Sequence, residues 1–98
     1  MKLITKATAR KIPPLYGQEN LSEETTLAYV KLFTPDSNWT WYITEMNPDT
    51  GECFGVVCGH ERELGYFNLP ELELLRGPLG LPVERDRFFD PTPVNLCK

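Results

Sequence analysis

Hydrophobic and polar positions alternate along the middle of the chain in a way that predicts β-strands. Residues 27–33 are rich in β-branched and aromatic side chains, and residues 52–58 are apolar enough for a central strand. A shorter run at 64–68 predicts a fourth strand. In the run 39–46, alternate residues fall on opposite faces of an extended chain: Trp39, Trp41 and Ile43 on one, Thr40, Tyr42 and Thr44 on the other.

Turn signals separate these runs. TPDSN at 34–38, NPDTG at 47–51 and HERELG at 60–65 combine residues that favour tight turns. In the second of them proline presets φ, and Gly51 supplies a positive φ. The chain from 27 to 68 is therefore predicted to form an antiparallel meander of three or four strands.

Two short helices flank the predicted sheet. Thr5 is suited to cap a helix over 6–12, which the prolines at 13 and 14 end. Asn68 is suited to cap a second helix over 70–76, with Gly77 as its C-terminal stop. The side chains expected to face the sheet are Leu3, Ile4, Ala7, Leu72 and Leu75. With an edge strand expected at 83–88, the prediction is an α+β fold with residues 1–98 as a single domain.

Composition agrees with an ordinary globular protein. Hydrophobic residues make up 41% of the chain and charged residues 24%, which is far from a disordered sequence. The start, MKLIT, lacks the apolar segment of a signal peptide, and no apolar run of about 18 residues or more is present. We therefore expect a cytoplasmic protein that makes no membrane contact.

Charge is unevenly distributed along the chain. The net charge is −4, yet the first 18 residues contain four basic residues and no acidic one. An acidic body argues against a dedicated duplex-DNA binder, because phosphate contacts require clustered Lys and Arg. The basic start leaves single-stranded nucleic acid as an alternative partner, with these candidate contacts: Lys2, Lys6, Arg10 and Lys11.

No motif for catalysis, metal binding or a cofactor stands out. The candidate ligands for a zinc site are Cys53, Cys58, His60 and Cys97. Five positions separate the first two cysteines in a predicted strand, so their side chains point to opposite faces. Three cysteines cannot all pair, and we expect free thiols. No serine lies in a nucleophile context and no glycine-rich phosphate loop is present. The expectation is no metal, no cofactor and no enzyme activity.

Two loops are longer and more constrained than a connection requires. The turn 34–39 mixes rigid turn residues with an aromatic side chain, and the segment RGPLGLPVERD at 76–86 carries arginines among prolines and glycines. Glu84 and Asp86 alternate with the arginines, which predicts surface ion pairs. We expect the two loops to lie together, with an arginine stacked on Trp39. The candidate partner-binding residues are Asp36, Ser37, Asn38, Trp39, Arg76 and Arg85.

Several long strings carry a resemblance to a known family. They are MKLITK at the start, PPLY at 13–16, LFTPDSNWTWY at 32–42, HERELGYF at 60–67 and RGPLGLPVERD at 76–86. They cover nearly the whole chain, which resembles a family of small bacterial proteins defined only as a domain of unknown function. Members of that family tend to be encoded on plasmids, integrative elements and phage-like islands. The resemblance implies an accessory protein of mobile DNA.

Together these observations favour a non-enzymatic binding module that acts through protein–protein contacts. A weak single-stranded nucleic-acid binder is the first alternative, and a small enzyme of unknown reaction is the second. Salt dependence separates the first two, because phosphate binding weakens steeply with salt. Neither the identity of the partner nor the oligomeric state follows from the sequence.

Overall fold

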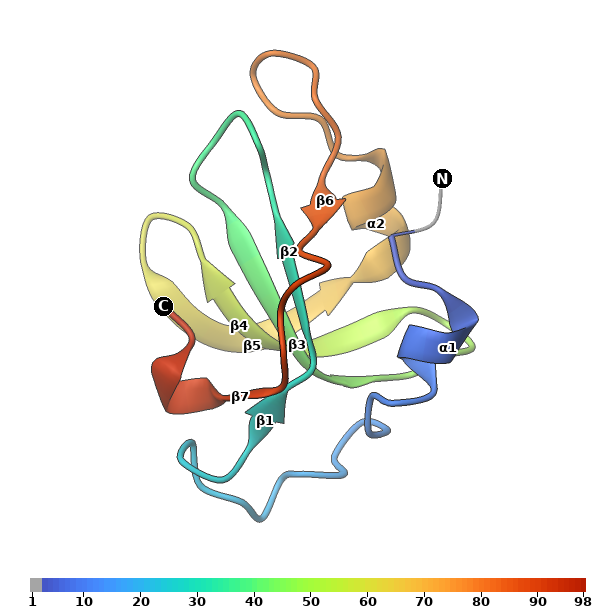
Figure 1. Ribbon diagram of the computed structural model, residues 1–98, viewed down its shortest axis with the longest axis vertical. Coiled ribbons are helices and arrows are strands. Elements are labelled where there is room, and N and C mark those ends of the chain that lie inside the picture. Colours follow the sequence, from blue (N-terminus) through green and yellow to red (C-terminus); the bar gives the residue numbers. More distant parts are fainter. Residues whose placement is uncertain (1–2) are drawn as a thin grey trace.

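The computed structural model describes residues 3–98 and contains two antiparallel sheets. The larger sheet has the strand order β5-β4-β3-β2-β6 and the smaller one pairs β1 with β7 (Figure 1). The strands are β1 (Leu27–Ala28), β2 (Val30–Phe33), β3 (Thr40–Met46), β4 (Glu52–Cys58), β5 (Arg62–Asn68), β6 (Glu84–Arg85) and β7 (Thr92–Pro93). The helices are α1 (Lys6–Ala9), α2 (Leu69–Leu74) and a 3₁₀ turn, η1 (Val94–Leu96).

The predicted meander is present, and the predicted α+β class is confirmed. Strands β2 to β5 follow one another in sequence and in space, with turns at the three predicted places. The third turn, predicted over 60–65, is confined to 59–61 because β5 already begins at Arg62. The predicted count of three or four strands was too small, since β6 adds a fifth strand and β1 and β7 form a second sheet. Among the described residues, no helix is long and apolar enough to cross a membrane.

The strand predicted over 27–33 is divided at Tyr29. Strand β3 contains a bulge between Ile43 and Glu45, and Ile43 is the residue that pairs with Val30 at the start of β2. A bulge bends a strand and increases its twist. The chain before Tyr29 therefore leaves the large sheet, and β1 pairs with the C-terminal strand β7 instead.

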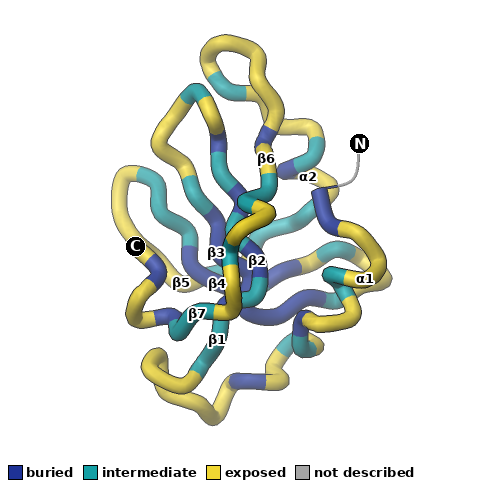
Figure 2. Tube along the Cα trace, in the orientation of Figure 1, coloured by how far each residue is buried: buried dark blue, intermediate teal, exposed yellow. Residues whose placement is uncertain are grey.

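Both faces of the large sheet are covered. On one face the N-terminal segment and α2 bring Leu3, Ile12 and Leu72 against Trp41 and Ile43. On the other face the C-terminal segment brings Val94 and Cys97 against Tyr42 and Val56. Strand β3 is therefore buried along almost its whole length, as the dark segment at the centre of Figure 2 shows.

Both helices are shorter than predicted. Helix α1 ends at Ala9, and the chain continues as a tight turn because Pro13 disfavours helical backbone at Ile12. Thr5 caps α1 as expected, but Ala7 is exposed.

Helix α2 ends at Leu74, since Leu75 is already extended. Leu75 is consequently exposed, contrary to the prediction, and Gly77 is not the helix stop. The edge strand predicted over 83–88 contains only β6, because Asp86 starts a turn by accepting the Phe88 amide.

Candidate functional site

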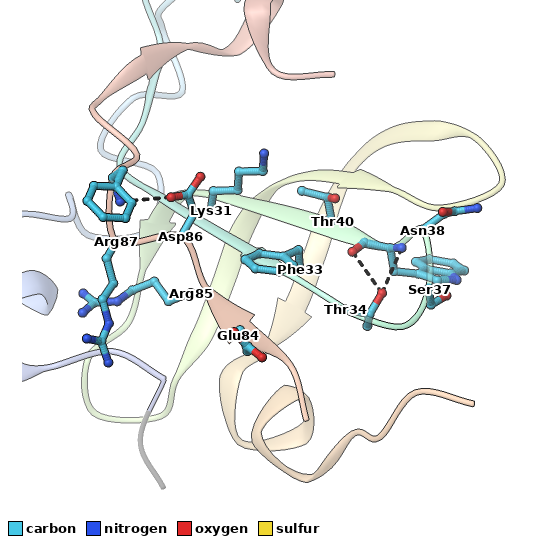
Figure 3. A pocket seen from close by; sticks show the side chains of 12 residues that line it. Lys31, Phe33, Thr34, Ser37, Asn38, Thr40, Glu84, Arg85, Asp86 and Arg87 are labelled. Atoms are coloured by element: carbon cyan, nitrogen blue, oxygen red, sulfur yellow. Dashed lines mark hydrogen bonds between the residues drawn. The ribbon is translucent and has the colours of Figure 1, made fainter. Parts of the chain in front are cut away.

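The turn between β2 and β3 is closed on itself by Thr34 and Trp39. The Thr34 amide donates to the Trp39 carbonyl at 3.0 Å, and the Thr34 hydroxyl accepts the Trp39 amide at 3.1 Å. The hydroxyl also donates to the Trp39 carbonyl at 3.3 Å (Figure 3). Threonine is a residue whose side chain replaces backbone partners in turns. Ser37 and Asn38 are therefore held at the exposed tip of a rigid turn.

Asp36 reaches from this turn into the loop that follows α2. Its Oδ2 accepts the amides of Leu79 at 2.8 Å and Leu81 at 3.3 Å. The loop is itself a small hairpin, in which Gly77 donates to the Leu81 carbonyl at 2.9 Å and Arg76 bridges to Pro82. The expectation that the two loops lie together is thus correct, and we call residues 34–39 and 76–82 the double loop.

Gly77 is required for this contact. A Cβ at that position would overlap the carboxylate of Asp36. Asp36 Oδ1 is buried, and residues 3–98 offer it no hydrogen-bond partner. The carboxylate is therefore held by the two amides on one side and by the backbone of Gly77 on the other.

Trp39 packs on other aromatic rings, and the predicted arginine stack is wrong. Its ring lies 6.1 Å from that of Trp41 at 23° and 5.7 Å from His60 at 77°. It also covers Gly59, where a Cβ would collide with the indole. Trp39 remains 37% exposed, so it is both part of the fold and part of the surface.

The two arginines expected near Trp39 are engaged elsewhere. Arg76 Nη1 donates to the carbonyls of Glu73 and Leu75. Arg85 Nη1 donates to the Thr8 hydroxyl at 2.8 Å, and so points toward α1. The predicted ion pairs with Glu84 and Asp86 are also not formed; within residues 3–98 the one ion pair joins Arg62 and Glu23.

A hollow of about 780 Å³ lies beside the double loop on the face of β2 and β6. Phe33 lies at its centre, with Lys31 and Thr40 nearby (Figure 3). Side chains of both charges surround it, among them Glu84 and Arg87. Phe88 lines it and is 93% exposed. The only sequence signal for this residue is an aromatic pair within a proline-rich, polar segment.

The basic start of the chain meets the C-terminal arm. A smaller hollow of about 270 Å³ is lined by Thr8, Lys11, Tyr29, Arg85 and Arg87, together with Asp86 and Asp90. Lys6, Arg10 and Lys11 are exposed. Lys2, the fourth predicted contact, lies outside the described residues.

The cysteines lie on both faces of the sheet, as the strand pattern predicts. Cys53 is buried with Trp41 and Ile43, whereas Cys58 and Cys97 pack near Tyr42. Burial raises the pKa of the Cys53 thiol to about 12 and also raises the pKa of Cys97. All three are free thiols. In the described part of the chain, no three His, Cys, Asp or Glu side chains are grouped so that they could hold a metal ion.

A second surface was missed by the sequence reasoning. Tyr16, Phe54, Leu64 and Tyr66 line a largely apolar hollow of about 360 Å³, on which the loop 15–26 forms one wall. The floor contains Glu45, a buried carboxylate whose Oε1 accepts the Tyr16 amide at 2.7 Å and whose Oε2 accepts the Gln18 amide at 3.0 Å. The sequence signal that could have indicated this surface is the spacing of Leu64 and Tyr66, which places both side chains on one face of the predicted strand.

Comparison with known proteins gives one match. Searches of curated proteins and of solved structures found none. A family model described as "Protein of unknown function (DUF2958)" matches residues 3–96, nearly the whole described chain. The chain therefore belongs to the DUF2958 family, in agreement with the resemblance to a domain of unknown function.

Proposed function

We propose that this protein is a non-enzymatic binding module whose partner is another protein, held at the double loop. The observation that carries the proposal is the Asp36 carboxylate, which joins two loops 43 residues apart in sequence by accepting the Leu79 amide. Loops fixed in this way lose little conformational entropy on binding, so more of each contact contributes to affinity.

The exposed side chains around this clamp support the proposal. Leu79 is 80% exposed, Leu81 and Trp39 are partly exposed, and Phe88 extends almost fully into solvent. Trp39 and Phe88 line the hollow beside the double loop, and Leu79 and Leu81 belong to the double loop itself. Exposed apolar groups on a rigid surface with charged residues around them are typical of protein interaction sites. Phe88 and Trp39 are the aromatic anchors that we expect to contribute most.

The family resemblance supplies the setting of this proposal. We place the protein in the bacterial cytoplasm, as an accessory protein of plasmids or other mobile elements. Ser37 and Asn38 at the exposed turn tip would then contribute polar contacts at the rim of the interface.

The test is a quantitative capture experiment from the native host. Tagged wild-type protein, the double variant Leu79→Ala/Phe88→Ala and the control Leu96→Ala are compared, each with and without nuclease. Leu96 is also an exposed leucine, but it lies on η1, away from the double loop (Figure 1). We expect the double variant to bind the partner at least about tenfold more weakly, since truncating a hot-spot side chain costs about 2 kcal/mol or more of binding free energy.

A protein partner retained equally by all three forms would place the interface elsewhere. A partner lost from wild type after nuclease treatment would favour nucleic acid. Circular dichroism of each variant checks the fold; both substituted side chains are largely exposed, so unfolding is not expected.

One observation favours the nucleic-acid alternative. The Arg85–Thr8 hydrogen bond brings the C-terminal arm to α1, so Lys11, Arg85 and Arg87 line one hollow with Tyr29. Arginines beside an aromatic ring suit single-stranded nucleic acid. If nucleic acid binds there, neutralising Lys6 and Arg10 of the neighbouring basic N-terminal segment should flatten the salt dependence of oligonucleotide binding. An unchanged slope would exclude this segment as the contact.

A further inference from the structure

Strand β5 is an open sheet edge of seven residues. It is the terminal strand of the large sheet and pairs with β4 from Arg62 to Asn68 without a register shift. No other strand of residues 3–98 pairs with its outer side. The opposite edge is different, because β6 has only two residues and follows Pro82.

Proteins usually protect such edges. Prolines, bulges, lysines and very short strands prevent unwanted pairing. Strand β5 has none of these features, although Arg62 and Glu63 are charged, and each of its residues is exposed or half-buried. The outer backbone of β5 is therefore free to accept another strand.

An apolar groove runs beside this edge. Leu64 and Tyr66 project from the same face of β5 and are 47% and 53% exposed. The Tyr66 ring packs on Phe54 of β4 with ring centroids 4.9 Å apart. Tyr16 and Leu21 of the loop 15–26 form the facing wall of the hollow.

The wall is held in place before any ligand arrives. Tyr16 has a positive φ of 67°, a conformation unfavourable for residues other than glycine. The bond from its amide to Glu45 Oε1 stabilises this conformation. Gln18 adds bonds from its side chain to the Leu27 and Thr44 carbonyls. The groove is therefore preformed.

The charge around the groove is negative. Glu19, Glu23 and Glu45 line it, and Glu61 and Glu63 are exposed on or beside β5. The cation on β5, Arg62, is already engaged, since it donates to the carbonyls of Val94 and Cys97 as well as to Glu23. A partner with positive charge would therefore be attracted to this edge.

We propose that β5 and the Tyr16–Tyr66 groove bind a basic, extended peptide segment, which adds as a further strand to the sheet. Main-chain hydrogen bonds to β5 provide affinity, apolar side chains at alternate positions enter the groove, and Lys or Arg residues contact the glutamates. A second copy of this chain is disfavoured as the occupant because it would bring another set of the same glutamates to the edge. This site is separate from the double loop and does not depend on its function.

The test uses three short synthetic peptides with blocked ends. The first alternates Lys with Val and Leu over seven residues, the second replaces each Lys by Glu, and the third has Pro at the centre of the first. Binding is followed through the backbone amide signals of the isotopically labelled protein. We expect the basic peptide alone to bind, with shifts concentrated at 62–68 and at the loop 15–26.

Protein variants locate the site independently. Leu64→Ala/Tyr66→Ala should weaken binding of the basic peptide at least about tenfold. Phe88→Ala, in the hollow beside the double loop, should not change this binding. Glu61→Gln/Glu63→Gln should weaken binding and reduce its salt dependence.

Four outcomes would overturn the proposal. They are no binding at millimolar peptide, equal binding of the proline peptide, amide shifts that avoid β5, and concentration-dependent self-association through β5, which would make a second copy the occupant. The amide map on wild-type protein remains decisive if a variant fails to fold. The peptide measurement is independent of the capture experiment. If Leu79→Ala/Phe88→Ala loses or keeps its captured partner, the conclusion about β5 does not change.

Discussion

The carboxylate of Asp36 lies directly against the backbone of Gly77, with no space for a side chain between them. This contact and the two amides that Asp36 accepts connect the β2–β3 turn to the loop after α2. The double loop therefore depends on two residues 41 positions apart, one for its carboxylate and one for its lack of a side chain.

Gly77→Ala should destabilise the protein by about 1–3 kcal/mol, because the added methyl group overlaps the carboxylate and forces a backbone shift. Gly65→Ala is the matched control. An added Cβ there meets nothing within 4 Å, so its effect on the free energy of unfolding should stay within about 0.5 kcal/mol. Urea unfolding measures both, and equal effects would contradict the proposed contact.

Glu45→Ala should release the loop 15–26 from the sheet. The carboxylate accepts two backbone amides while buried, and hydrogen bonds to charged groups contribute about 1.5–3 kcal/mol each. We expect faster proteolytic cleavage within 15–26, located by mass spectrometry. Glu19→Ala, an exposed carboxylate of the same loop, is the control and should cleave at the wild-type rate. Resistance of the Glu45 variant would show that the other contacts of the loop, those of Gln18 and Glu23, are enough to hold it.

The three thiols should react with alkylating reagents in a defined order. Cys58 is the only one of them that is not buried, so it should react first at neutral pH. Cys53 and Cys97 are buried, and desolvation raises the pKa of both, which lowers their thiolate fraction. Peptide mapping after timed alkylation gives the order. Early modification of Cys53 would contradict the packing described here.

Ionisation of Cys53 should weaken the folded state in alkaline solution. Its pKa is raised from 9.0 to about 12 by burial, so the protonated thiol is favoured in the native state. The resulting stability is fully present below pH 9 and is lost as the pH rises toward about 12. Cys53→Ala should have a shallower decline of unfolding free energy over this range. An identical slope in both proteins would assign the alkaline transition to other groups.

Tyr66 should titrate later than an ordinary tyrosine. The neighbouring Tyr16 hydroxyl is the main cause that raises the pKa of Tyr66 from 10.0 to about 12. Removing that hydroxyl in Tyr16→Phe should lower the pKa of Tyr66 toward its ordinary value. Tyrosinate absorbance, assigned with a Tyr66→Phe reference, measures the shift. An unchanged titration in Tyr16→Phe would mean that the two phenols do not interact across the groove.

The turn residues of the double loop were predictable, but their contacts were not. TPDSN has the composition of a tight turn, and Asp36 is a residue type that accepts backbone amides. Sequence reasoning assigned Asp36 to its own turn, whereas its acceptors lie in the loop 76–82. The prediction of an arginine stacked on Trp39 failed for the same reason, because Thr8 binds Arg85 and the carbonyls at the end of α2 bind Arg76.

The sequence by itself determined the four strands of the meander, the three turns between them and the opposite orientation of Cys53 and Cys58. These features depend on side-chain alternation and on the backbone preferences of proline and glycine, which act over a few residues. Only the tertiary structure decided that β3 contains a bulge after Ile43. The bulge returns Met46 to the face of Ile43 and leaves Glu45 opposite Phe54, facing the loop 15–26. Its position, like the open edge of β5, depends on pairing between segments distant in sequence, which local patterns do not encode.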